Sequence, residues 1–408
     1  MSFPEIAERL DRYRDEMIDL QVKLASIPAV APSSGGEGEA RKAEFLVEEL
    51  KRGGFRDIDV IKAPDLDAPD GFRPNILAAT RGRSSAKTIW IMTHMDVVPP
   101  GELAQWNGNP FKPWIESGKI YGRGVEDNQQ DMVASIFAVK AFRDLGLQPA
   151  YDVGLALVAD EETGSEKGIA HVLRHSEAFR KDDLIIVPDA GSEDGTLIEV
   201  AEKSILWLKI KTLGKQSHGS MPERGINAFK AASHLAVELN GLYAAFPQND
   251  PLFDPPISTF EPTKKEANVP NINTIPGEDV FYMDCRVLPR VKVEDVDAYF
   301  EDAVARIEKR FGVSITLEDR QRAIAAPPTS PTAAVVRALD TAVGAVLGRK
   351  SRPMGIGGGT VAALFRREGF EAACWSKLDE TAHQPNEYCI IDNMVSDAKV
   401  FAHIMTQE

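Results

Sequence analysis

Residues 89–96 read Ile-Trp-Ile-Met-Thr-His-Met-Asp, an apolar run that ends in two side chains able to carry chemistry. A short apolar run of this kind is typical of a buried strand, and functional groups of α/β sheets gather where such strands end. His94 and Asp96 stand two positions apart, so on an extended backbone their side chains point the same way. The stretch therefore predicts a strand with a site at its carboxyl end, where an imidazole binds a metal and a carboxylate orients the ring. Alone, a His-x-Asp pair is a weak signal.

Strand and helix patterns alternate on both sides of this strand. The predicted elements are helices 6–27, 39–50 and 132–142, and strands 75–79, 88–92, 152–158 and 183–187. Strands that alternate with helices indicate an α/β fold with a mostly parallel sheet.

The pattern changes near Lys203. Here the predicted elements are strands 205–211, 280–287 and 313–317 with helices 227–242 and 293–311, followed after a loop by helix 332–347 and strand 372–376. The middle group describes a compact α+β unit that looks inserted. We therefore expect a discontinuous metal-binding catalytic domain of residues 1–203 and 323–408, and an inserted domain of residues 204–322.

The composition of the chain indicates which kinds of molecule it can bind. The chain has 408 residues, with 47 Lys and Arg against 62 Asp and Glu, and its net charge of −15 disfavours nucleic acid and anionic membrane surfaces. A small-molecule substrate is therefore expected. Three scattered cysteines indicate neither a disulfide framework nor a thiolate metal site, and no signal peptide or membrane span is visible. These features favour a cytoplasmic protein.

Four further motifs place acids or a histidine just past predicted strands or in loops. They are Asp127 within residues 122–128, Glu161 and Glu162 within 159–165, Asp189 within 187–191, and His383 within 379–387. Each has an ordinary explanation: a helix N-cap for Asp127, solvated turns for the other acids and a surface position for the histidine.

Together with His94, however, the five motifs are hard to attribute to coincidence. Two imidazoles and several carboxylates without a thiolate suit a pair of divalent ions such as zinc, cobalt or manganese. A structural calcium site is the alternative, but calcium prefers oxygen ligands, and the two histidines argue against it.

The five motifs, in this order, resemble those of the cocatalytic zinc peptidases and deacylases. That family includes succinyl-diaminopimelate desuccinylase, acetylornithine deacetylase, aminoacylase, carboxypeptidase G and the dipeptidases, and the resemblance covers nearly the whole chain. It implies a metallopeptidase or amidohydrolase that uses two divalent ions, zinc first, to cleave the amide bond of a dipeptide or an N-acyl amino acid. It also implies that the inserted domain is a lid that often forms the contact of a homodimer.

The resemblance assigns roles to individual residues of the first domain. The implied metal ligands are His94, Asp127, Glu162, Asp189 and His383. Asp127 would bridge both ions and precede a cis peptide bond to Asn128. Asp96 would orient His94, and Glu161 would act as general base, taking a proton from the attacking water and passing it to the leaving amine.

The resemblance also assigns roles to residues that are not metal ligands. The implied substrate-binding residues are Asn273, Arg286, Gly358, Gly359 and Thr360, the last three in a loop that binds a carboxylate. His218 resembles the histidine that reaches a neighbouring subunit's site and stabilises the oxyanion. Without the family, His218 is equally well explained as a turn residue and Arg286 as a surface residue.

Two departures from the family pattern affect the expected substrate. Asn128-Gln129-Gln130 follows the bridging acid where many members have an acid or Met and then Lys-Gly. Asp189 stands where the family's deacylases commonly have Glu, and Asp is more typical of its aminopeptidases and dipeptidases, which favours peptides. A non-catalytic binding protein on the same scaffold is the competing hypothesis, but such a protein normally lacks a ligand or the base, and here every position is filled.

Overall fold

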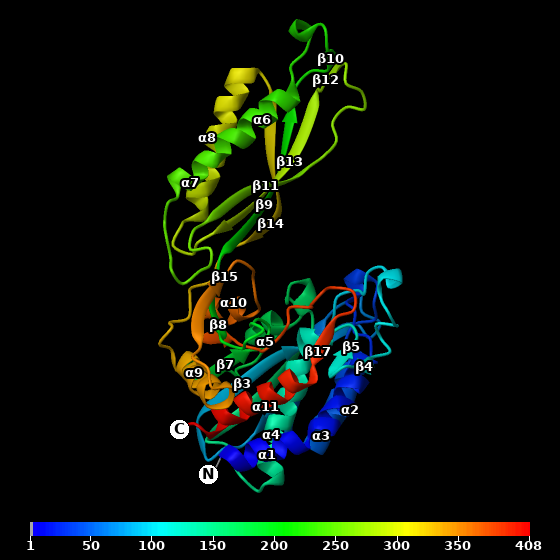
Figure 1. The fold of residues 1–408 in the computed structure, drawn as a ribbon, viewed down its shortest axis with the longest axis vertical. Helices are drawn as coiled ribbons and strands as arrows, with labels where there is room; N and C mark the ends of the chain where they lie inside the picture. The colour runs from blue at the N-terminus through cyan, green and yellow to red at the C-terminus, as the bar shows by residue number, and fades with distance from the viewer. Residues whose placement is uncertain (1–2) are drawn as a thin grey trace. The chain divides into compact units, whose positions relative to one another are not determined.

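The computed structural model describes residues 3–408, which form two compact units (Figure 1). Unit 1 consists of the residues up to Val200 together with Thr329–Pro353 and Thr360–Glu408, and unit 2 consists of Ala201–Pro328 and Met354–Gly359. The short segment Met354–Gly359 is a part of unit 2 that the sequence pattern did not separate from the rest of the chain's last third. The catalytic role of unit 1 and the lid and dimer roles of unit 2 stay predictions.

Unit 1 is built on an eight-stranded sheet with the order β1-β2-β6-β3-β7-β16-β8-β15, although the last residues of β8 and β15 belong to unit 2. Its strands are β1 (Asp57–Pro64), β2 (Phe72–Thr80), β3 (Ser84–His94), β6 (Tyr151–Val158), β7 (Leu184–Val187), β8 (Leu197–Glu202), β15 (Arg352–Ile356) and β16 (Ala372–Cys374). The central strands β6, β3, β7 and β16 pair in parallel. β2 pairs antiparallel with both β1 and β6, and β8 pairs antiparallel with β16. The predicted α/β class is confirmed.

Helices cover both faces of this sheet (Figure 1). They are α1 (Phe3–Arg12), α2 (Arg14–Ala25), α3 (Ala40–Gly53), α4 (Gln130–Asp144), α5 (Ile169–His175), α9 (Ala334–Leu347), α10 (Ala362–Arg367) and α11 (Ile391–Thr406). α4 and α9 both contact α11 and the sheet, while α5 and α10 contribute to a core with alternate residues of β3 and β6 such as Trp90 and Ala156. Within residues 3–408 no helix is long and apolar enough to cross a bilayer.

The predicted single helix 6–27 is wrong in one respect, because the structure breaks it at Tyr13 into α1 and α2. The hydroxyl of Tyr13 donates to Asp144 Oδ2 at 2.5 Å, and its ring lies 5.4 Å from that of Phe137. Both partners belong to α4, so the residue at the break makes a distant contact that hydrophobic spacing within the segment does not reveal.

Two helices pack on one antiparallel sheet in unit 2. The sheet has the order β11-β13-β9-β14, with β9 (Ser204–Leu213), β11 (Thr259–Lys265), β13 (Glu278–Val287) and β14 (Ser314–Ala323). α6 (Ala228–Glu238) and α8 (Val293–Phe311) bury apolar residues such as Leu235 and Phe300 in one core with the strands. A short α7 (Leu242–Ala245) follows α6, and a two-stranded ribbon joins β10 (Ser217–His218) to β12 (Thr274–Ile275).

Candidate metal centre

The candidate metal ligands come from five places in unit 1. His94 is the last residue of β3, Glu162 follows β6, Asp189 follows β7, Asp127 lies just before α4, and His383 lies in the loop before β17 (Tyr388–Ile390). Because β3, β6 and β7 are parallel, their carboxyl ends meet at one edge of the sheet. The fold therefore brings motifs that are separated along the chain close together in space.

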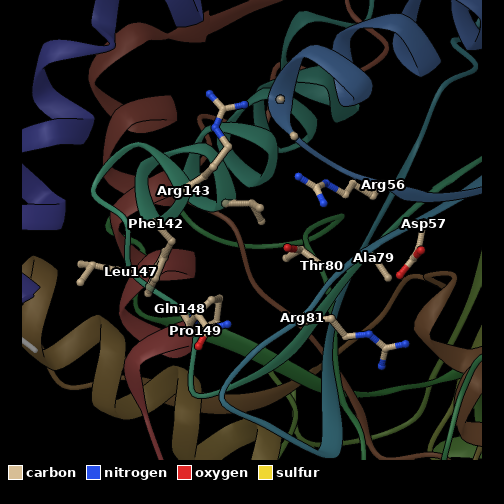
Figure 2. A pocket seen from close by; sticks show the side chains of 13 residues that line it. Arg56, Asp57, Ala79, Thr80, Arg81, Phe142, Arg143, Leu147, Gln148 and Pro149 are labelled. Carbon is tan, nitrogen blue, oxygen red and sulfur yellow. The ribbon is translucent and has the colours of Figure 1, made fainter.

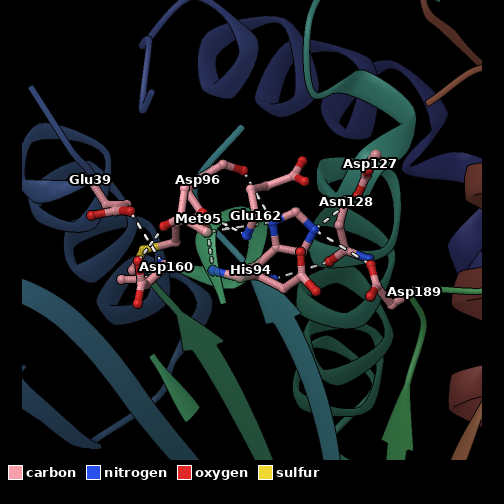
Figure 3. A network of polar contacts seen from close by, with 12 residues as sticks. Glu39, His94, Met95, Asp96, Asp127, Asn128, Asp160, Glu162 and Asp189 are labelled. Carbon is pink, nitrogen blue, oxygen red and sulfur yellow. Dashed lines mark hydrogen bonds and ion pairs between the residues drawn. The ribbon is translucent and has the colours of Figure 1, made fainter. Parts of the chain in front are cut away.

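Asp127 is shared by two groups of possible ligands, of which Figure 3 labels His94, Asp127, Asp189 and Glu162. In the first, His94 Nε2 lies 2.9 Å from Asp127 Oδ1 and 3.5 Å from Asp189 Oδ1. In the second, His383 Nε2 lies 3.1 Å from Asp127 Oδ2 and 3.1 Å from Glu162 Oε2. The two oxygens of Asp127 therefore face different imidazoles, which is the arrangement that a bridging carboxylate requires.

His94 is buried and the carboxylates around it are half-buried, and this partial burial strongly affects their protonation. Burial raises the pKa of Glu161 well above its ordinary value, and the charge of Asp189 adds to the effect. Burial also raises the pKa of Glu162. For Asp127 burial acts in the same direction, but the hydrogen bonds from His383 and His94 outweigh it and hold the pKa below its ordinary value.

This donor set fits a pair of divalent ions. Each group offers one imidazole and two carboxylates, all with ligand atoms within 4.8 Å of one another, and neither contains a thiolate. Nitrogen and carboxylate donors of this kind suit zinc, cobalt or manganese. Several carboxylates crowded together in a buried place repel one another, and cations among them would remove that cost.

The orientation of His94 differs in detail from the prediction. Its Nδ1 lies 3.1 Å from the backbone oxygen of Asp96 and 3.6 Å from the carboxylate Oδ1. The carboxylate of Asp96 instead accepts the backbone N–H groups of Glu161 at 3.1 Å and Glu162 at 3.0 Å. Asp96 therefore contacts the ring of His94 and also fixes the turn that carries the proposed base.

The same turn is held from its other side by a buried ion network that the sequence did not suggest. Arg73 donates to both carboxylate oxygens of Glu39 and to Asp160 Oδ1 at 3.2 Å, and all three side chains are buried. Buried Lys42 donates to Met95 O at 3.0 Å. The only sequence signal was polar residues inside otherwise apolar helix and strand patterns.

The backbone around two ligands has unusual geometry. The Asp127–Asn128 peptide bond is cis, as predicted from the family resemblance. Asp127 does not cap α4, which begins at Gln130 after a segment with non-helical dihedral angles at Asp127 and Asn128. Next to Asp189, Gly191 allows close backbone approach, since a Cβ there would lie 1.9 Å from Ser376 O.

Five of the remaining predicted residues lie in unit 2, where the structure brings His218 and Asn273 together. His218 pairs with Thr274 between β10 and β12, and the backbone oxygen of neighbouring Asn273 accepts Gly219 N at 2.7 Å. His218 is exposed, and its Nδ1 lies 2.8 Å from Ser220 Oγ.

Arg286 joins the predicted glycine loop within unit 2. Its Nη1 donates to Gly357 O at 2.8 Å, and its Nε donates to Asp284 Oδ1 at 2.6 Å. Gly358 and Gly359 follow in this unit, whereas Thr360 belongs to unit 1, where its Oγ1 lies 3.4 Å from Cys374 Sγ. The guanidinium of Arg286 thus lies beside the loop expected to bind a carboxylate.

A second charged region lies at the other end of the same central strands (Figure 2). It is a surface cavity of about 370 Å³ whose lining includes Arg56, Arg81 and Arg143. Thr80, also in the lining, pairs with Val153 at the start of β6, whereas His94 pairs with Val158 at its end. We call this the arginine cavity.

Comparison with known proteins identifies relatives of this chain. The model of peptidase family M20/M25/M40 matches residues 90–407. An uncharacterized metallohydrolase of Methanocaldococcus jannaschii is 40% identical over 407 residues, covering 96% of this chain and 99% of that protein. Succinyl-diaminopimelate desuccinylase of Nitratiruptor sp. is 26% identical over 378 residues, covering 91% of this chain and 94% of that protein.

A solved structure shows the same fold. Human carnosine dipeptidase 1 superposes with a TM-score of 0.74 at 17% sequence identity, covering 99% of this chain and 98% of that chain.

Proposed function

Because the chain belongs to peptidase family M20/M25/M40 and is a hydrolase acting on amide bonds, we propose that it cleaves a dipeptide or an N-acyl amino acid at a two-zinc centre. The observation that carries the proposal is the pair of ligand groups that share Asp127, with Glu161 adjoining them. Metal-dependent hydrolysis agrees with the metallohydrolase relative, and cobalt or manganese would fit the same donors.

In this proposal His94, Asp127 and Asp189 would hold one ion, and Asp127, Glu162 and His383 would hold the other. When bound, such a pair lowers the pKa of water and polarises a carbonyl oxygen. The residues of the chain then supply positioning and proton transfer.

Glu161 is the proposed general base. Its backbone N–H is fixed by Asp96, and its side chain lies with His94 and Glu162 in a third group of close ligand atoms. It would take a proton from the attacking water and deliver it to the amine as the C–N bond breaks, so that the products are a carboxylic acid and an amine.

Unit 2 supplies the remaining proposed roles. His218 would donate to the oxyanion from a neighbouring subunit of a homodimer, and Asn273 and Arg286 would bind the substrate's carboxylate or carbonyl. The carboxylate would also meet the loop of Gly358, Gly359 and Thr360. We propose a cytoplasmic enzyme without nucleic-acid or membrane partners, in keeping with its net charge of −15.

Two substrate classes are supported by different observations. An Asp at position 189 and the fold shared with carnosine dipeptidase 1 favour dipeptides. The sequence similarity to a succinyl-diaminopimelate desuccinylase favours N-acyl amino acids. Both have a free carboxylate beside the scissile amide, which the Arg286 region could bind.

The test is amine release by the zinc- or cobalt-loaded protein from matched panels of dipeptides, N-acetyl amino acids and N-succinyl amino acids. We expect one class to be cleaved, and activity to disappear with a chelator and return when metal is restored. The same side chain should be presented in all three panels, so that differences report the acyl group alone. Absence of release from every panel, with bound metal verified, would contradict the proposed substrate classes.

A further inference from the structure

Two loops beside the metal centre each contribute a glutamate whose side chain binds the other loop. One loop carries Asp127 and the other carries His383. Glu126 directly precedes Asp127, and Glu387 follows His383 by four residues. Each glutamate directs its carboxylate onto the loop that carries the other ligand. Neither was assigned a role from the sequence, although both stand inside the motifs of the predicted ligands.

Glu126 accepts hydrogen bonds from several donors of the His383 loop. Its Oε1 accepts Asp379 N at 2.7 Å, and its Oε2 accepts Thr381 Oγ1 at 2.8 Å and Ala382 N at 3.1 Å. The backbone N–H of Thr381 donates to the same Oε2. The side chain is buried, so water does not compete for these donors. The residues it binds lead directly into His383.

Glu387 does the same for the Asp127 loop. Its Oε1 accepts Glu126 N at 3.0 Å and Asp127 N at 3.2 Å, and its Oε2 accepts Gly124 N at 3.0 Å. The guanidinium of Arg123 donates to Oε2 at 2.6 Å, and Glu387 is fully buried. One of these donors is the backbone of the bridging ligand itself.

His383 depends on such support because little else fixes it. Its side chain is 56% exposed, and its backbone has φ 64°, outside any helix or strand. The nearest ladder is the pairing of β17 with β5 (Lys119–Tyr121), which begins five residues after His383. The carboxylates of Glu126 and Glu387 therefore connect the two loops in the stretch between the β17–β5 pairing and the ligands.

We propose that Glu126 and Glu387 are reciprocal positioning residues that set the Asp127–Glu162–His383 group for its divalent ion. This inference rests on the two-ion centre of the proposed function. A carboxylate offers only acceptors, whereas an amide would turn an NH₂ group toward at least one of the N–H donors. Glutamine at either position would therefore loosen one loop with little change in side-chain size.

The experiment is calorimetric titration of the metal-free protein with Co²⁺, comparing wild type, Glu126→Gln and Glu380→Gln. Glu380 lies exposed on the same loop, so its substitution removes one negative charge but none of the described donors. We expect wild type and Glu380→Gln to bind two equivalents. Glu126→Gln should bind the first equivalent normally and the second about 10–100-fold more weakly, the effect of losing a partner that orients a ligand.

Equal affinity of Glu126→Gln and wild type for both equivalents would overturn the inference. If Glu126→Gln does not fold, the titration of Thr381→Val decides, since it removes the hydroxyl contact with Glu126 at nearly constant size, together with the contacts of the same hydroxyl with the backbone of Tyr388. A weaker second equivalent supports the inference, and an unchanged one overturns it. A wild-type chain that binds only one equivalent would instead overturn the two-ion function, and this inference with it.

Discussion

Both ends of the central strands in unit 1 carry charged side chains, but these side chains differ in their exposure to solvent. At the metal centre His94, Asp96 and Asp127 converge on one another, and the first two are buried. In the arginine cavity Arg81 lies 3.0 Å from Asp152 and Arg143 donates to Asp144 at 2.7 Å, and both arginines are solvent-exposed (Figure 2). Charge density alone therefore does not distinguish a functional site.

The difference lies in what solvent can do for each group. The exposed arginines in the cavity are screened by water, so their ion pairs contribute little to stability. Buried groups at the centre keep their full desolvation cost, so each needs a partner, a proton or a cation. Substitutions at the two ends should consequently differ in effect.

The largest effect is expected for Glu161→Gln. Removing the general base should lower kcat about 10²–10⁴-fold, while the ligands of both groups are retained. Metal content measured by mass spectrometry on the same preparation separates loss of the base from loss of metal. Near wild-type kcat in this variant would exclude Glu161 as the base.

Breaking the buried network next to the centre should mainly cost stability. Arg73→Met leaves the buried carboxylates of Glu39 and Asp160 without their guanidinium, and we expect a loss of about 3–5 kcal/mol in the free energy of unfolding. Urea unfolding of the metal-free protein measures this loss. A change below about 1 kcal/mol, the range of exposed pairs, would show that the network behaves like a surface contact.

Lys42 offers a pH-dependent test at the same end of the sheet. Burial lowers its pKa from 10.5 to about 8, although the charges of Asp96 and Glu39 oppose the change. Between these values the unfolded chain binds more protons than the folded chain, so the contribution of Lys42 to stability rises with pH and is lost as pH falls below about 8.

Lys42→Met lacks this titration. From about pH 7.5 to about pH 10 the stability of the wild type should therefore rise by about 2 kcal/mol relative to the variant. Urea unfolding of the two metal-free proteins at both pH values gives the difference directly. A constant difference across the range would show that the buried amine does not change protonation there.

Much of the fold followed from sequence because it depends on local pattern. The apolar run at residues 89–92 and the acids after later strands were sufficient to place the candidate ligands at one sheet edge. The helix break at Tyr13 was not predicted, and the residue at the break contacts Asp144, 131 residues away, which the spacing of the segment does not show.

The supporting residues of the centre were missed for the same physical reason. Arg73 and Glu39 are 34 residues apart, and nothing in the spacing of either shows that they meet. Glu126 and Glu387 lie inside the quoted motifs. Their partners, however, are backbone N–H groups of another loop, and such groups have no sequence signature. Side-chain chemistry can be predicted from residue type, whereas the backbone groups that hold it appear only in three dimensions.

The smallest effect is expected in the arginine cavity, and it completes the comparison with Arg73. The side chain of Arg81 is 74% exposed beside Asp152, so Arg81→Ala should change the free energy of unfolding by only about 0–1 kcal/mol. Because this pair lies at the opposite end of β6 from the ligands, kcat/KM should stay unchanged. Urea unfolding and the amine-release assay, run beside Arg73→Met, measure both quantities. A loss of activity in Arg81→Ala without loss of stability would show that the arginine cavity is coupled to the metal centre and that exposure is a poor guide to function in this chain.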